Sequence, residues 1–201
     1  MAQAVERKWR GRIADERKAE RRVQLLTAAV KVYSERGFRH SSVKAVCEAA
    51  GLTERYFYES FANSEDLLIA VASASTNHLM AELREKADAV PREQRLRAIL
   101  LNYFLLLRNQ PAHARTFMVE IRGISPGVDA YLVSAVETFA ELIADAALDN
   151  LSRVERLVAV GAVGAIVHIA LDWIINDFAM PIDDVVDAAC RLGAVLEKDV
   201  G

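Results

Sequence analysis

The sequence predicts an all-α protein, and three observations support this fold class. The 201 residues include only four prolines and nine glycines, which is too few for a turn-rich β-protein. Apolar residues recur at helical spacing along most of the chain, and no alternating strand-like pattern persists. Hydrophobic residues make up 53% and charged residues 26% of the chain, a composition typical of globular proteins.

The first predicted helix covers about residues 14–36, where one face is apolar at helical spacing. Gly37 provides a left-handed stop after this helix, and Phe38 can fold back onto its end. The apolar face is formed by Leu25, Leu26, Ala29, Val32 and Tyr33.

Two short helices joined by a tight glycine turn follow, and they are the elements of a helix-turn-helix over residues 42–61. Ser41 or Ser42 is expected to cap the first of them, which ends at Gly51. Thr53 is expected to cap the second, over 54–60. Small alanines allow the two helices to cross closely, and the apolar anchors of the second helix are Leu52, Phe57 and Phe61.

The remaining chain is predicted to form longer helices. Asn63 caps a fourth helix, which has acidic residues in its first turn, where the helix dipole favours them. The segment 157–175 is apolar on nearly all faces, so it should be covered on all sides. A last amphipathic helix is expected over 182–198. The breaks between helices fall at Pro91, Pro111, 125–127 and Pro181.

The net charge of −3 averages a basic N-terminal part and an acidic remainder. Residues 1–60 hold 13 Lys and Arg against 8 Asp and Glu (+5), and residues 61–201 hold 12 against 20 (−8). A basic end on an acidic body suits a protein that holds a polyanion at one end. The charges in 6–22 are compatible either with a solvated arm or with a tail along DNA phosphates.

Cysteine content and apolar runs indicate a soluble cytoplasmic protein with no membrane partner. Cys47 and Cys190 imply no disulfide framework, and each suits a small buried apolar position. The N-terminus opens no apolar signal region. The uncharged run 157–171 is shorter than the roughly 20 residues that a helix needs to cross a bilayer.

Several short segments together carry a family resemblance: Ala28-Ala29, Arg36-Gly37-Phe38, Ser41-Ser42-Val43, Ala50-Gly51-Leu52-Thr53, Tyr58, Phe61 and Glu65-Asp66-Leu67-Leu68. With these features, the stretch from about Arg21 to Leu68 resembles the DNA-binding domain of the TetR family of repressors. The remaining chain matches that family only in plan, as a helical body of the right length.

The charge pattern predicts a basic arm over 1–20. The resemblance implies a three-helix DNA-binding domain over 21–66 and a helical effector-binding and dimerisation domain over 67–201. It further implies a homodimer that binds a palindromic site on double-stranded DNA and is released by a small-molecule effector. Dimerisation would use the last two long helices.

The resemblance assigns DNA contacts to Ser42, Lys44, Thr53, Arg55, Tyr56 and Tyr58. Arg55 could bond bidentately to guanine, Tyr58 matches a phosphate-binding tyrosine, and the start of the second helix can hold phosphate. One departure is Ser64, where the family often has lysine. Either the basic arm compensates for this loss, or DNA affinity is modest.

An effector pocket is expected from inward residues of the middle helices: Tyr103, Leu107, Phe117, Glu120, Phe139, His168, Asp172 and Trp173. Each aromatic residue is also compatible with an ordinary core position, which is the more common place for such residues. His168 has three interpretations: a pocket residue, a residue of a dimer seam, or a hydrogen-bonded core histidine.

No enzyme motif is evident, and neither a metal nor a cofactor is expected. The four histidines, His40, His78, His113 and His168, have no metal-binding spacing. Nucleophile and di-iron motifs are also lacking. Two alternatives to an effector-released repressor stay open: a helical small-molecule sensor with a weak DNA-binding head, and an activator or architectural DNA-binder without a ligand.

Overall fold

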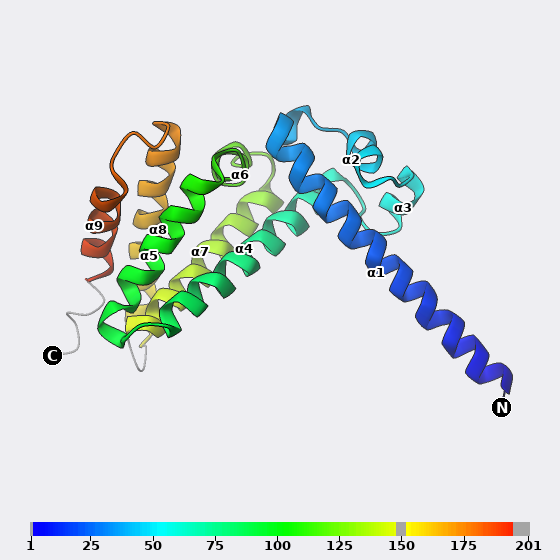
Figure 1. Ribbon diagram of the computed structural model, residues 1–201, viewed down its shortest axis with the longest axis horizontal. Coiled ribbons are helices and arrows are strands. Elements are labelled where there is room, and N and C mark those ends of the chain that lie inside the picture. Colours follow the sequence, from blue (N-terminus) through cyan, green and yellow to red (C-terminus); the bar gives the residue numbers. More distant parts are fainter. Residues whose placement is uncertain (1, 148–151, 195–201) are drawn as a thin grey trace. The chain divides into compact units, whose positions relative to one another are not determined.

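The computed structural model describes residues 2–147 and 152–194, with side chains from residue 15 onward and without that of residue 147 (Figure 1). Every regular element in these ranges is helical, which confirms the all-α prediction. The elements are α1 (Ala2–Arg36), a 3-10 turn η1 (Phe38–His40), α2 (Val43–Ala50), α3 (Glu54–Tyr58), α4 (Ser64–Asp88), α5 (Arg92–Asn109), α6 (Pro111–Ala114), a π-helical turn η2 (Arg115–Glu120), α7 (Pro126–Ala147), α8 (Arg153–Ile175) and α9 (Ile182–Gly193).

The chain divides into two compact units, Met1–Val71 and Ala72–Gly201. The first unit contains α1, α2, α3 and the start of α4. The second contains the rest of α4 and the helices α5 to α9. Helix α4 is therefore a single helix to which both units contribute.

Helix α1 is longer than expected, since it begins at Ala2 rather than near residue 14 (Figure 1). The predicted arm over 1–20 is thus the N-terminal part of α1 and not a separate extended segment. Alanine, arginine, lysine and glutamate dominate this part, and all are good helix formers. The side chains of residues 2–14, which include four of the arm's six cations, lie outside the described residues.

The apolar face predicted for α1 forms the core of the first unit. Leu25, Ala29, Val32 and Tyr33 are buried, whereas Leu26 is only partly so. Phe38 folds back as expected, and its ring meets that of Tyr33 edge-on with centroids 5.3 Å apart.

The caps of the short helices are mostly those predicted from sequence. The Ser42 hydroxyl accepts from the Ala45 amide at 3.1 Å, and the Asn63 side chain accepts from the Asp66 amide at 2.8 Å. Gly51 has the left-handed conformation, with φ 66° and ψ 28°. Thr53 holds the N-cap position of α3 but makes no side-chain capping bond, so that part of the prediction is wrong.

The core of the second unit lies among α5, α7, α8 and α9, which pack on one another. One face of helix α8 packs into this core, and the fully buried residues on that face include Val163, Ile166 and Ile174. Helix α9 approaches α5 closely, because a Cβ atom added at Gly193 would lie 2.8 Å from a Leu96 methyl carbon. The expected end of the last helix at 198 falls outside the described residues.

Helix α8 is not covered on all sides by its own chain. Its opposite face is exposed, and the exposed fractions of Val154 (69%), Leu157 (68%) and Ile175 (56%) are large. The helix is also longer than its uncharged run, so by length and composition it could cross a membrane, with 33% of its most apolar window buried. A core helix of a soluble protein can have the same length and apolar composition. This exposed apolar stripe of α8 is a suitable surface for contact with another apolar surface.

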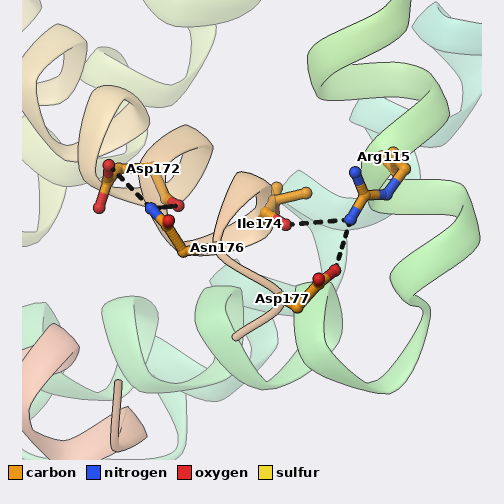
Figure 2. A network of polar contacts seen from close by, with 5 residues as sticks. All are labelled: Arg115, Asp172, Ile174, Asn176 and Asp177. Carbon is orange, nitrogen blue, oxygen red and sulfur yellow. Dashed lines mark hydrogen bonds and ion pairs between the residues drawn. The ribbon is translucent and has the colours of Figure 1, made fainter. Parts of the chain in front are cut away.

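The C-terminal end of α8 is held by Arg115 from η2 (Figure 2). The Arg115 guanidinium donates to the Ile174 carbonyl oxygen at 3.3 Å and to the Asp177 carboxylate at 2.7 Å. Asp177 and Phe178 both have positive φ angles, 51° and 58°, which are unfavourable for residues other than glycine. The contacts of Arg115 therefore secure a turn that the local backbone does not favour.

Candidate nucleic-acid interface and effector core

The short helix α3 presents an exposed polar face and is anchored by one apolar side chain. Phe57 is completely buried and contacts the rings of Tyr58 and Phe61. On the opposite side, Thr53 and Arg55 are exposed, and 85% of the Arg55 side chain is accessible. Tyr58 is also largely exposed, at 58%. These three residues are therefore available to a ligand as large as DNA.

The start of α2 offers a second exposed patch. Ser42 is exposed and caps the helix, and the Lys44 side chain is 73% exposed beside Glu48, with Nζ 3.9 Å from the carboxylate. A positive side chain at the positive end of a helix dipole is a suitable partner for phosphate.

Two arginines of α1 hold the recognition segment, and sequence reasoning missed this role. The Arg21 guanidinium lies over the Tyr56 ring, 4.4 Å from its centroid. The Arg22 guanidinium lies over the Phe61 ring at 4.3 Å and donates to the Ser60 carbonyl oxygen at 3.0 Å. In the sequence they are simply two more cations of a basic segment, and only the packing of α1 on α3 distinguishes them.

Glu59, immediately after α3, is a third residue that the sequence did not single out. Its two carboxylate oxygens lie 3.4 Å from Nη2 of Arg21 and 3.4 Å from Nε of Arg55. Tyr56, stacked under Arg21, is only half-exposed. Arg55 and Tyr56, both predicted DNA contacts, are thus linked through Arg21 and Glu59.

Asp66, one of the two acids that follow Ser64, has a structural role at the start of α4. The Asp66 carboxylate accepts from the Ala62 amide at 3.2 Å, while the Asp66 amide donates to Asn63. This reciprocal cap fixes the start of α4. Asp66 is therefore occupied with the helix terminus, and Ser64, the first residue of α4, is only partly exposed.

Part of the predicted effector site forms an aromatic cluster in the second unit. The rings of Tyr103 and Phe139 lie 4.9 Å apart, and Trp173 packs on Phe104 at 5.6 Å. The Tyr103 hydroxyl donates to the Met118 sulfur at 3.7 Å, and burial raises the pKa of Tyr103 well above its ordinary value. A buried phenol that donates to a thioether sulfur is a weakly satisfied polar group.

The other predicted pocket residues are dispersed. Leu107 and Phe117 are buried, and Glu120 at the end of η2 is partly exposed. His168 and Asp172 are exposed on α8, away from the buried aromatic cluster. Asp172 accepts from the Asn176 side chain at 3.1 Å (Figure 2). The structure therefore brings Tyr103, Phe139 and Trp173 together but leaves these two polar residues on the surface.

Comparison with known proteins links this geometry to a family. Residues 25–71 match the family model described as bacterial regulatory proteins, tetR family. The transcriptional activator FasR of Mycolicibacterium smegmatis is 28% identical over 180 residues, which are 86% of this chain and 80% of that protein. A fatty acid metabolism regulator protein of Bacillus subtilis is 28% identical over 104 residues, covering 50% of this chain and 52% of that protein.

Solved structures share the fold. A TetR transcriptional regulator from Rhodococcus sp. RHA1 matches with a TM-score of 0.73 at 16% identity, covering 93% of this chain and all of that one (100%). The regulator FadR from Bacillus subtilis, solved in complex with stearoyl-CoA, matches with a TM-score of 0.66 at 19% identity, covering 89% and 99% of the two chains.

The relatives named here are transcription regulators and not enzymes. The matched segment contains α2, α3 and the exposed face on which the predicted DNA contacts lie. The N-terminal helix-turn-helix segment, residues 25–71, matches the tetR family of bacterial regulatory proteins, and the all-helical chain shares the fold of a solved TetR transcriptional regulator.

Proposed function

We propose that this DNA-binding regulator acts as a homodimer on a palindromic operator and that a small-molecule effector releases it, so that it represses transcription. The observation that carries the proposal is the exposed face of α3, where the Arg55 guanidinium projects from a helix anchored by the buried Phe57. A short recognition helix with one exposed arginine suits the major groove, in which arginine pairs with guanine.

The DNA-binding face is proposed to consist of Ser42, Lys44, Thr53, Arg55, Tyr56 and Tyr58. Its two parts have different roles. The start of α2 and Tyr58 hold phosphates, which fixes the position of the protein on the duplex. Arg55 reads a base. The N-terminal part of α1 adds cations that would bind any DNA sequence.

The exposed stripe of α8 supports the proposed dimer. Leu157, Gly161 and His168 lie on this stripe, and a Cβ atom added at Gly161 or Gly164 would meet nothing within 4 Å in the single chain. An apolar helix face with small residues permits close packing against a second copy of itself. We propose a four-helix seam of α8 and α9 from each chain, which places His168 at the interface.

The two units are proposed to have different functions. Residues 21–66 would bind DNA and residues 67–201 would bind the effector and the partner chain. Two DNA-binding units about 34 Å apart would enter successive major grooves. Because α4 is shared by both units, an effector that tilts α4 would alter this spacing. Release then requires that the effector binds more tightly to the DNA-incompetent spacing.

The relatives suggest a chemical class for the effector. FadR was solved with stearoyl-CoA, and a second relative is a fatty acid metabolism regulator. The aromatic cluster around Tyr103 and Phe139 would suit an acyl chain, with the Tyr103 hydroxyl available to a carbonyl oxygen. We therefore propose a long-chain acyl thioester as the effector.

Activation is the second candidate outcome, because FasR is an activator. A selection from random DNA should yield a palindromic motif, and the purified protein should shift a fragment that carries it in a salt-sensitive manner. Stearoyl-CoA should release the fragment, whereas coenzyme A alone should not. A promoter reporter with this motif then separates the two outcomes, since expression rises on deletion of a repressor and falls on deletion of an activator. If no motif is selected, the proposed function is wrong.

A further inference from the structure

The geometry points to Glu59 as a positioning residue of the DNA-binding face, one that holds Arg55 in the orientation that reads its base pair. This inference rests on the proposed role of Arg55 in base recognition. It adds to that role a residue that touches the reading side chain and need not touch DNA.

Glu59 lies between two guanidinium groups that come from different helices. One carboxylate oxygen is 3.4 Å from Nε of Arg55, and the other is 3.4 Å from Nη2 of Arg21, which donates a hydrogen bond to it. Exposure decreases along this series: 85% of the Arg55 side chain is accessible, 34% of Glu59 and 22% of Arg21. The carboxylate is therefore fixed from α1, and Arg55 is the free end of the series.

Arg21 is itself held in place by a second contact. Its guanidinium lies over the Tyr56 ring, 4.4 Å from the centroid, so the ion pair with Glu59 and the ring contact restrain it together. A cation held in this way can orient a carboxylate more firmly than a freely rotating surface lysine would.

The atom of Arg55 that faces Glu59 determines what Arg55 can still bind. Pairing through Nε leaves both terminal Nη atoms unoccupied by this contact. Those two atoms can donate side by side to O6 and N7 of guanine. Restraint before binding also reduces the side-chain freedom that an exposed arginine loses when it engages a base.

The charge of Glu59 gives a second argument. A carboxylate on a surface that meets phosphates lowers affinity for DNA of every sequence. Glu54, the first residue of α3, carries the same charge, but its side chain makes no hydrogen bond or ion pair among the described residues. The two acids should therefore repel DNA alike, and only Glu59 should affect base preference.

The experiment compares base preference and general affinity in matched variants of the full-length protein. The selected motif first identifies the base pair at which Arg55→Ala loses its preference. Fluorescence anisotropy with duplexes substituted at that pair, and with an unrelated duplex, is then measured for wild type, Glu59→Gln and Glu54→Gln. The double variant Arg55→Ala/Glu59→Gln completes a cycle with the single ones.

Glu59→Gln should reduce the preference at the Arg55 base pair by about fivefold or more, since one good bidentate contact accounts for roughly 5- to 100-fold discrimination. It should also strengthen binding to the unrelated duplex. Glu54→Gln should strengthen that binding but keep the preference. In the Arg55→Ala background, Glu59→Gln should leave the preference unchanged.

The inference is overturned if Glu59→Gln keeps the wild-type preference, or if Glu54→Gln reduces it equally, which would make it a charge effect. A changed preference at a different base pair would mean that Glu59 reads DNA directly, and this also overturns it. A motif that is selected normally but does not depend on Arg55 overturns the inference while leaving the proposed regulator intact. If wild type selects no motif, the proposed function and the inference fail together.

Discussion

The guanidinium of Arg115 lies 2.7 Å from the carboxylate of Asp177, a residue whose positive φ angle ends α8. The same guanidinium also donates to the Ile174 carbonyl oxygen at the end of α8, which accepts from the Asp177 amide at 3.2 Å as well. The side chains of both ionic partners are well exposed, at 43% and 86%. We therefore expect the carbonyl contact to contribute more to stability than the ion pair does.

Arg115→Met should lower the free energy of unfolding by about 1 kcal/mol, because the Ile174 carbonyl loses its side-chain donor. Asp177→Asn should cost less, since asparagine tolerates the left-handed conformation and the carbonyl contact persists. Urea denaturation at low and high salt measures both effects. A loss that is equal in the two variants and disappears in high salt would assign the stabilisation to the ion pair instead.

Leu157→Arg should weaken the proposed dimer, because a charge would enter the apolar stripe of α8. We expect the dimer dissociation constant to rise at least about tenfold, in line with loss of an energetically important interface residue. Sedimentation velocity over a range of concentrations measures this change. Val133 on α7 is a matched control, since it is 60% exposed, and Val133→Arg should leave the association unchanged. A dimer insensitive to Leu157→Arg places the seam elsewhere.

His113 should make stability depend on pH. Burial lowers the pKa of this imidazole below its ordinary value of 6.5, and its ring packs on Phe117 with centroids 4.4 Å apart. As pH falls below the unfolded-state pKa, the unfolded chain takes up the proton first, so the free energy of unfolding decreases until the folded-state pKa is passed.

Replacing His113 with leucine should therefore reduce the fall in unfolding free energy between about pH 7 and pH 5. Chemical denaturation across this range gives the slope for each protein. His78→Gln is the control, because His78 is an exposed residue paired with Glu82 on α4. An unchanged slope in His113→Leu would show that other groups carry the pH dependence.

Deletion of residues 2–14 should weaken binding to all DNA sequences. The deleted segment carries four cations, Arg7, Lys8, Arg10 and Arg12. Each phosphate contact contributes about −0.9 to the slope of log K against log salt, so the slope should become shallower by up to about 3–4. Anisotropy titrations at several salt concentrations measure it. The deletion variant should keep the base preference of the wild type, whereas Arg55→Ala should lose it at one base pair. If the deletion variant has the same salt slope as the wild type, the N-terminal part of α1 does not take part in the DNA interface.

The helix-turn-helix could be predicted because its determinants act within a few residues. Ser42 and Asn63 cap their own helices, and Gly51 supplies one left-handed residue, so each leaves a local signal. Thr53 shows the limit of this reasoning, since it stands at the right position without making the bond. The restraint of Glu59 by Arg21 involves residues 38 positions apart, and no local pattern encodes it.

In the body, periodicity predicted the helices but could not assign their faces. An apolar helix such as α8 gives no sequence contrast between the side that meets its own chain and the side that meets another surface. His168 and Asp172 were therefore placed with the aromatic core, whereas both are exposed. The early start of α1 was missed because a dense run of charges suggests a solvated arm, although the same residue types favour a helix.

The π-helical turn η2 has an evolutionary consequence. A π-turn closes through i→i+5 hydrogen bonds and so holds about one residue more than an α-turn. A relative that lost one residue between Arg115 and Glu120 could close this segment into an α-helix, and the residues on the two sides of the deletion would then be rotated about the helix axis by roughly 100° relative to each other. Insertion or deletion of one residue, rather than substitution, would thus be the direct route by which lineages change the side chain that Tyr103 meets.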